Sequence, residues 1–207
     1  MMRLLTVALA FVMAAGSASA GVMFTILDKP AKYTPGDAFT VRIEIENVTD
    51  LAAFDLELKL SSDSLSAIAG TDFGFTPFTD APGSPDYVFD GNPTDFYFIQ
   101  STGFDATYAY LVVGDVFDDG IQGVDVGLGT PRLLAEATIF TTLSTGNLTL
   151  TFGDFSVLYL PDFVGEIDLT DASYAGEGSI ASVPEPGSAS IFGMGLLGFC
   201  LLRRFRA

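Results

Sequence analysis

The stretch YTPGDAFTVRIEIENVTDLAAFDLELKLSSDSL, residues 33–65, decides the fold class of this chain, because apolar and polar residues alternate along most of it. The alternation is clearest in AFTVRIEIENV (38–48) and in FDLELKL (54–60). A period of two predicts β-strands with one buried face and one face in water. The turn signal Pro35-Gly36-Asp37 precedes the first of them. We therefore expect two successive strands here.

Strand patterns also occur in the rest of residues 21–182, which we call the body of the chain. Residues 147–152 alternate in the same way, whereas residues 95–101, 106–117 and 132–143 are apolar on both faces, as expected of central strands. Turn signals separate these segments, and none of them has the period of an amphipathic helix. The sequence therefore predicts an all-β fold, an antiparallel jelly-roll sandwich of about nine strands. The Pro-, Gly-, Asp- and Phe-rich segment 70–95 is expected to be a long loop or insertion.

Two stretches of the body resemble a known family. Residues 33–65 resemble the opening of a cohesin-like domain, and residues 132–160 are similar to a later strand pair of that family. The matching positions in the first stretch are Gly36, Asp37, Asn47, Val48, Leu51, Ala52, Phe54, Asp63 and Leu65. The resemblance implies a nine-stranded jelly-roll sandwich over residues 21–182, related in architecture to carbohydrate-binding modules. Cohesins of cellulose-degrading complexes dock a calcium-binding partner module, and such docking is an open possibility for this chain.

The first 20 residues are typical of a secretory signal peptide. Arg3 supplies a positive charge, an apolar run follows from Leu4 to Ala15, and small residues close the segment. The apolar run is too short to span a membrane comfortably. We expect cleavage at the site formed by Ala18, Ala20 and Gly21, so that the mature protein begins outside the cytoplasm.

The other end, residues 183–207, has a different layout. Pro-Glu-Pro is followed by an uncharged segment, 188–202, that could cross a bilayer as a short transmembrane helix, and then by an Arg-rich end that should stay cytoplasmic. This order strongly resembles the PEP-CTERM sorting signal of Gram-negative bacteria. The resemblance implies processing by an exosortase at the inner membrane and delivery to the cell envelope or extracellular matrix. The motif residues are Val183, Pro184, Glu185, Pro186, Arg203, Arg204 and Arg206.

The body of the chain is strongly acidic. The net charge of the whole sequence is −17, and the stretch from Gly21 to Pro186 carries 26 acidic and five basic residues, which gives it a net charge of −21. Nucleic acid is therefore not an expected partner, because phosphate binding requires Lys and Arg. An acidic polysaccharide would also be repelled unless divalent cations bridged the two surfaces.

The reactive residue types are few. The chain has no histidine, and its one cysteine, Cys200, lies in the terminal apolar segment. This composition excludes Ser-His-Asp and Cys-His catalysis and His/Cys zinc sites. Carboxylates remain, and they suit calcium. Four of them could form a calcium site, although Asp119-Gly120 also predicts a plain hairpin turn: Asp115, Asp118, Asp119 and Asp125. No catalytic residue and no other cofactor are expected.

These observations predict an exported, non-enzymatic surface or matrix protein, and three functions remain open. A carbohydrate-binding or scaffolding module should carry exposed aromatic side chains on one sheet face or around a loop. A protein-docking module should present a flat sheet face to a protein partner. A glycoside hydrolase, the least favoured, needs two facing carboxylates in a cleft.

Overall fold

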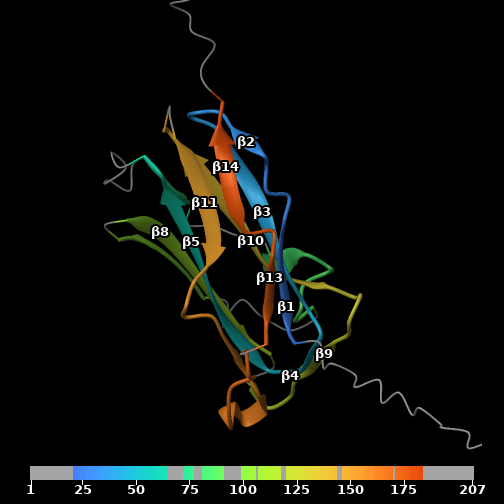
Figure 1. Cartoon of the computed structure of the whole chain (residues 1–207). Coiled ribbons are helices and arrows are strands. Elements are labelled where there is room, and N and C mark those ends of the chain that lie inside the picture. The colour runs from blue at the N-terminus through green and yellow to red at the C-terminus, as the bar shows by residue number, and fades with distance from the viewer. Residues whose placement is uncertain are drawn as a thin grey trace, which may run out of the picture.

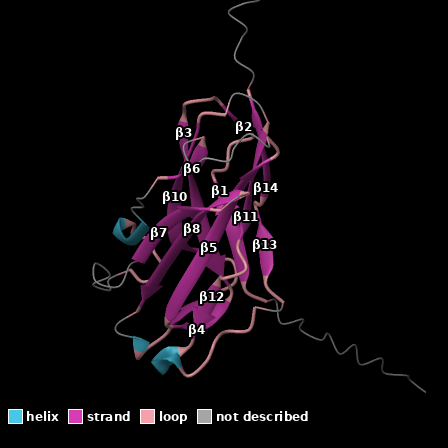
Figure 2. Ribbon diagram, turned by 90° about the vertical axis from the view of Figure 1, so that its left-hand side faces the viewer, coloured by secondary structure: helices cyan, strands magenta, loops and turns pink. Residues whose placement is uncertain are grey.

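The body of the protein is a sandwich of two β-sheets (Figure 1). The computed structural model describes residues 21–64, 72–76, 81–90, 99–105, 107–117, 120–143, 146–169 and 171–183. Strands make up most of this part of the chain, and helix is confined to short 3-10 turns such as η1 (Ala81–Gly83) and η4 (Pro161–Phe163) (Figure 2). The expected all-β class is confirmed.

One sheet has five strands in the described residues, in the order β13-β1-β3-β10-β6. Its strands are β1 (Met23–Leu27), β3 (Ala38–Glu46), β6 (Phe73–Phe75), β10 (Arg132–Thr141) and β13 (Ser173–Ala175). The long strands β3 and β10 pair antiparallel at its centre. This sheet is the backing layer behind the site described below.

The other sheet runs β2-β14-β11-β5-β8-β7 in the described residues, and β12 also pairs with β5. Its strands are β2 (Lys32–Tyr33), β5 (Ala53–Ser62), β7 (Ile99–Phe104), β8 (Tyr108–Val116), β11 (Asn147–Phe152), β12 (Val157–Tyr159) and β14 (Gly178–Ser182). A small pair, β4 (Val48–Leu51) with β9 (Val124–Val126), joins the layers at one end.

The strands expected around residues 38–48, 54–60, 106–117, 132–143 and 147–152 are all present, as β3, β5, β8, β10 and β11. The alternation predicts their burial as well. In β3 the side chains of Val41, Ile43 and Ile45 are buried, and in β5 so are those of Leu56, Leu58 and Leu60. Burying each such side chain stabilises the fold by roughly 1.5–3 kcal/mol, so this one core holds the two sheets together.

Three details of the expected architecture need correction. The described residues form fourteen strand segments rather than about nine, because short edge strands and interruptions divide the sheets. The sandwich is not wholly antiparallel, since β13 pairs parallel with β1 and β14 pairs parallel with β2. β7, which continues from the apolar segment 95–101, lies at the end of its sheet and not in its centre.

The segment 70–95 is more than a loop. Its residues 73–75 form β6, which extends the five-stranded sheet by pairing with β10. The aromatic side chains of Phe73, Phe75, Tyr87 and Phe89 are buried in the core, as expected of packing residues. The strand at 73–75 departs from the expected loop, because Pro and Gly in the segment indicate turns, whereas its buried Phe and Tyr side chains pack in the core.

The described part of the chain begins and ends at opposite ends of the sandwich (Figure 1). All the strand pairs and core residues that the structure describes lie between Gly21 and Val183. A polypeptide of residues 21–183 therefore contains the complete described fold. No helix in these residues is long and apolar enough to cross a membrane. The expected signal peptide 1–20 and the expected transmembrane helix 188–202 lie outside the described residues.

Candidate functional site

The outward side of the sheet around β5 and β8 carries polar and aromatic side chains. Leu56, Leu58, Leu111 and Val113 point into the core, so the residues that alternate with them point outward. Neighbouring elements contribute two more side chains to this surface. We call the whole set the outer face: Asp55, Glu57, Lys59, Tyr108, Tyr110, Val112, Phe155 and Tyr159.

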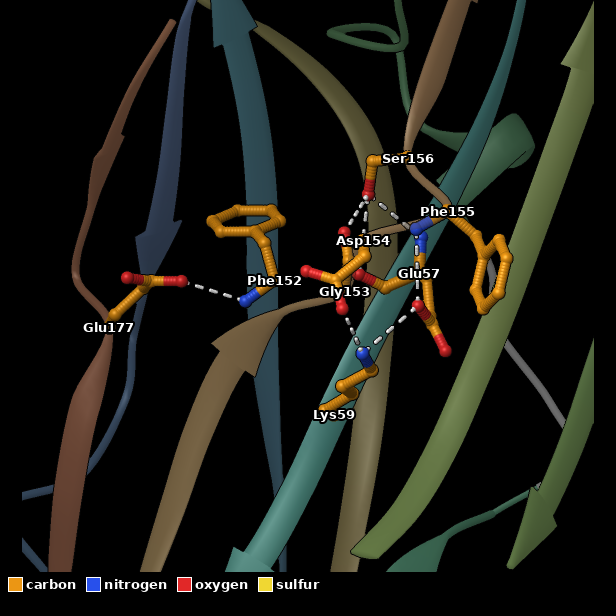
Figure 3. Close-up of polar contacts among 8 residues, drawn as sticks. All are labelled: Glu57, Lys59, Phe152, Gly153, Asp154, Phe155, Ser156 and Glu177. Carbon is orange, nitrogen blue, oxygen red and sulfur yellow. Dashed lines mark hydrogen bonds and ion pairs between the residues drawn. The ribbon is translucent and has the colours of Figure 1, made fainter. Parts of the chain in front are cut away.

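An ion-pair cluster lies at the centre of the outer face (Figure 3). The Lys59 ammonium is 3.1 Å from an Asp154 carboxylate oxygen and 3.6 Å from a Glu57 carboxylate oxygen. It also lies 5.3 Å from the centre of the Tyr108 ring, in a cation–π arrangement. The hydrogen bond to Asp154 raises the pKa of Lys59, although partial burial opposes this shift. Lys59 is therefore held charged and in place.

The loop Gly153–Ser156 crosses the outward side of β5. β11 and β12 pair with the same edge of β5, and this loop connects them by bulging over the outward face of the strand. The Gly153 amide donates to the Glu57 carbonyl (2.8 Å), and the Glu57 amide donates to the Ser156 hydroxyl (3.1 Å). The Phe155 amide donates to the Glu57 carboxylate (3.3 Å). The side chain of Glu57, only 4% exposed, therefore supports the loop from below.

Glycine at position 153 allows this close approach of the loop to β5. A Cβ there would collide with the side chain of Glu57. The loop can then turn Phe155 outward, and this residue is 73% exposed. Figure 3 shows the Phe155 ring on the β8 side of the loop and Phe152 on the opposite side. A large apolar side chain is thus presented to solvent by a loop that is anchored at three points.

The tyrosines of the outer face are half-buried and fixed. The Tyr110 ring lies across Gly103 of β7, where a Cβ would collide with it. The Tyr159 hydroxyl donates to an Asp55 carboxylate oxygen (3.2 Å), and both desolvation and the Asp55 charge raise the pKa of this phenol. Fixed tyrosines that lie along a sheet surface give it low relief and large contact area. Such residues are enriched among the energetic centres of protein interfaces.

The four aspartates considered for calcium do not all fall within the described residues. Asp115 is 2% exposed, and its carboxylate accepts hydrogen bonds from the Tyr87 hydroxyl (2.6 Å) and the Val116 amide (2.7 Å). Asp125 accepts one from the Asp50 amide (2.9 Å). Asp118 and Asp119 lie outside the described residues, within which no three acidic residues group as metal ligands. The calcium site stays a prediction.

The residues of the two processing signals fall mostly outside the described part. Gly21 and Val183 are its first and last residues, and the Val183 amide donates to the Tyr33 carbonyl (2.8 Å). Ala18, Ala20 and the remaining sorting-motif residues from Pro184 to Arg206 lie outside it. The first residue of the sorting motif, Val183, is therefore hydrogen-bonded to the sheet.

Sequence reasoning missed most of the outer face as a site. The alternation in β5 does place Asp55, Glu57 and Lys59 on one side of a strand. No sequence signal brings Phe155 to them, because its position depends on contacts between the loop and Glu57, 98 residues earlier in the chain.

The sorting signal is supported by comparison with known families. Residues 182–204 match the PEP-CTERM protein-sorting motif. This motif implies export, processing by an exosortase and sorting to the cell surface. No curated protein matches this chain in sequence. The expected PEP-CTERM resemblance is confirmed.

Solved structures identify the fold of the body. A chain of the crystal structure of a complex between a CaDoc0917 variant and CaCohA2 superposes with a TM-score of 0.52 at 16% identity, over 78% of this chain and 99% of that one. The solution structure of CaCohA2 from Clostridium acetobutylicum gives 0.51 at 15% identity, over 79% and 91%. At such identities the similarity shows the fold alone. The chain therefore carries a PEP-CTERM sorting motif after a body with a cohesin-like β-sandwich fold.

Proposed function

We propose that this protein is an exported, non-enzymatic surface protein whose cohesin-like module docks a protein partner through the outer face. The observation that carries the proposal is Phe155, a 73% exposed aromatic residue on an anchored loop, next in the chain to Asp154, which forms an ion pair with Lys59. A rigid aromatic anchor surrounded by polar groups is the usual composition of a binding hot spot. The solved CaDoc0917–CaCohA2 complex supports protein docking by a module of this fold.

The proposal includes a route to the surface. Signal peptidase cleaves after Ala20, and the helix 188–202 holds the chain in the inner membrane, with Arg203, Arg204 and Arg206 on the cytoplasmic side. An exosortase-type enzyme then removes this segment, and the body reaches the cell envelope or extracellular matrix of a Gram-negative bacterium. The partner is a second exported protein and not nucleic acid, since the body has a net charge of −21.

Polysaccharide binding is a second candidate, because aromatic rings on one sheet face can also stack on sugars. The half-buried state of Tyr108, Tyr110 and Tyr159 leaves Phe155 as the one strongly exposed ring of the outer face. A single exposed ring is a small platform for a glycan chain. Protein docking is therefore favoured over carbohydrate binding.

The test uses residues 21–183, immobilised and exposed to the exported proteins of the producing bacterium. A retained protein is identified by mass spectrometry, purified and titrated calorimetrically against wild type, Phe155→Ala and Leu128→Ala. Leu128 is an exposed apolar residue after β9, away from the outer face, and serves as the matched control. We expect Phe155→Ala to weaken binding about tenfold or more, and Leu128→Ala to change it less than about twofold.

Two results would overturn the proposal. Equal affinity of wild type and Phe155→Ala would remove the outer face as the docking surface. Saturable binding of the organism's exopolysaccharide, with no protein retained, would favour the second candidate. Repeating that titration with calcium and with chelator would show whether cations bridge the two acidic surfaces.

A further inference from the structure

A cavity of about 280 Å³ opens on the other side of the loop Gly153–Ser156. It lies where β11 ends, beside the turn between β13 and β14, and we call it the edge pocket. Phe152 and Tyr174 provide aromatic walls, and Asp154 and Glu177 provide carboxylates. Figure 3 shows Glu177 and Phe152 together on this side, opposite Phe155. One loop therefore borders both the edge pocket and the outer face.

The aromatic walls of the edge pocket are fixed by packing. Phe24, fully buried at the base, stacks on Tyr174 with ring centres 5.4 Å apart and planes 6° apart. Phe152 contacts both rings, at 5.5 Å from Phe24 and 5.1 Å from Tyr174. Tyr174 remains 42% exposed. Three mutually packed rings hold their orientation, and the outermost one faces the opening.

The charge of the edge pocket is negative. One Glu177 carboxylate oxygen accepts the Phe152 amide hydrogen bond at 2.8 Å, which fixes its position. Lys29 is close, but it donates to the backbone carbonyl of Glu177 (3.1 Å), and within the described residues the Glu177 carboxylate has no ion pair. Desolvation first, and the Glu177 charge second, raise the pKa of Tyr174, so its phenol stays neutral. Asp154 is already paired with Lys59.

The aromatic walls and the fixed Glu177 carboxylate together favour a positively charged ligand. An ammonium or guanidinium group is attracted by aromatic faces and can pair with a fixed carboxylate. An anion would be repelled, and an apolar group would cover the charged Glu177 carboxylate without supplying an opposite charge. The net charge of −21 over the body adds a long-range attraction for basic groups.

We infer that the edge pocket receives a Lys or Arg side chain of the protein that docks on the outer face. This inference rests on the proposed function and specifies the chemistry of the partner, which must present a basic side chain next to the surface that covers Phe155. The edge pocket lies next to the outer face because both border the loop Gly153–Ser156. Asp154 of this loop contacts Lys59 on the outer face and also lines the edge pocket.

The pocket can be tested without the partner, by NMR titration of ¹⁵N-labelled residues 21–183. The probes are N-acetyl-arginine amide and the neutral, nearly isosteric N-acetyl-citrulline amide. We expect saturable shifts at the amides of Phe152, Gly153 and Glu177 with the arginine probe, and at least about tenfold weaker binding of the citrulline probe.

Glu177→Gln is the decisive variant, because glutamine keeps an oxygen for the Phe152 amide and removes only the charge. We expect it to lower the affinity for the arginine probe at least about fivefold without changing the melting temperature, and to weaken partner binding as well. Asp37→Asn, which alters an exposed carboxylate in the turn between β2 and β3, should leave both affinities unchanged.

Three outcomes would overturn the inference. They are shifts spread over the acidic surface without saturation, equal binding of the two probes, and full binding by Glu177→Gln. None of them affects docking at the outer face, which Phe155→Ala tests separately. Partner binding that is lost in Phe155→Ala but intact in Glu177→Gln would thus reject the edge pocket and keep the proposed function.

Discussion

Asp115 is a carboxyl group inside the sandwich, on the inward side of β8. It alternates with the outward residues Val112 and Gly114, and this alternation explains why it does not face solvent. Burial raises its pKa to about 6, although the hydrogen bonds from the Tyr87 hydroxyl and the Val116 amide oppose this shift. In turn, burial and the nearby Asp115 charge raise the pKa of Tyr87. The pair ties residues 81–90 to β8.

The raised pKa of Asp115 gives a pH dependence with a definite sign. Between its ordinary pKa of 3.8 and about 6, the folded state keeps the proton that the unfolded state has released, so stability falls as pH rises through this window. Asp115→Asn cannot ionise. We expect its free energy of unfolding, relative to wild type, to increase by on the order of 1 kcal/mol between pH 5 and pH 8. Urea unfolding at the two pH values measures this difference.

Tyr87→Phe is the control for that measurement. It removes a hydrogen bond that lowers the pKa of Asp115, so the window should move to higher pH. Parallel pH profiles for wild type, Asp115→Asn and Tyr87→Phe would show that Asp115 does not titrate in the folded protein within this range.

At the scale of elements, the loop Gly153–Ser156 links the outer face to the edge pocket, and its path depends on the absence of a side chain at Gly153. Gly153→Ala would force a methyl group into Glu57. We expect a loss of about 1–3 kcal/mol in the free energy of unfolding, because the loop or the buried Glu57 must move. Chemical denaturation measures the loss, and the partner titration should show weaker binding as Phe155 shifts.

Gly83→Ala is the matched control for the loop. A Cβ at Gly83 would meet no atom within 4 Å, so this substitution should be neutral or slightly stabilising. Equal stability of the two alanine variants would mean that the loop tolerates a side chain at position 153, and that its path is not set by contact with Glu57.

Some of these elements could be predicted from the sequence and others could not. Long strands such as β3 and β5 were predictable, because period-two burial is local and each strand carries its own pattern. β6 was not, since a three-residue strand between turn residues is defined by its partner β10 and not by its own pattern. The outward side of β5 was predictable for Glu57 and Lys59. Phe155 and Glu177 were not, because hydrogen bonds between a backbone amide and a carboxylate far away in the chain position them.

At the scale of the whole molecule, the folded body and the sorting segment share residues. The PEP-CTERM match begins at Ser182, which pairs with Tyr33 as the last residue of β14. β14 also pairs antiparallel with β11, and its Ile180 is fully buried. The sorting segment could be predicted from the sequence, whereas strand β14, which leads into it, could not. Val183, the residue before Pro184, donates its amide to the Tyr33 carbonyl, so the sheet of the body reaches the first residues of the motif.

If β14 is part of the core, the body cannot fold without it. A chain of residues 21–176 would leave one edge of β11 unpaired, remove β2's partner and uncover the space filled by Ile180. We expect it to lose cooperative thermal unfolding and to aggregate through the open edge, whereas residues 21–183 melt cooperatively. Circular dichroism and size-exclusion chromatography compare the two chains. In the longer chain, Ile180→Ala should lower the free energy of unfolding by about 2–5 kcal/mol.

A cooperative, monomeric chain of residues 21–176 would show that β14 is dispensable and that an exosortase could draw it out of the sheet. Loss of folding would mean that β14 has to stay in the sheet while an exosortase acts on the chain.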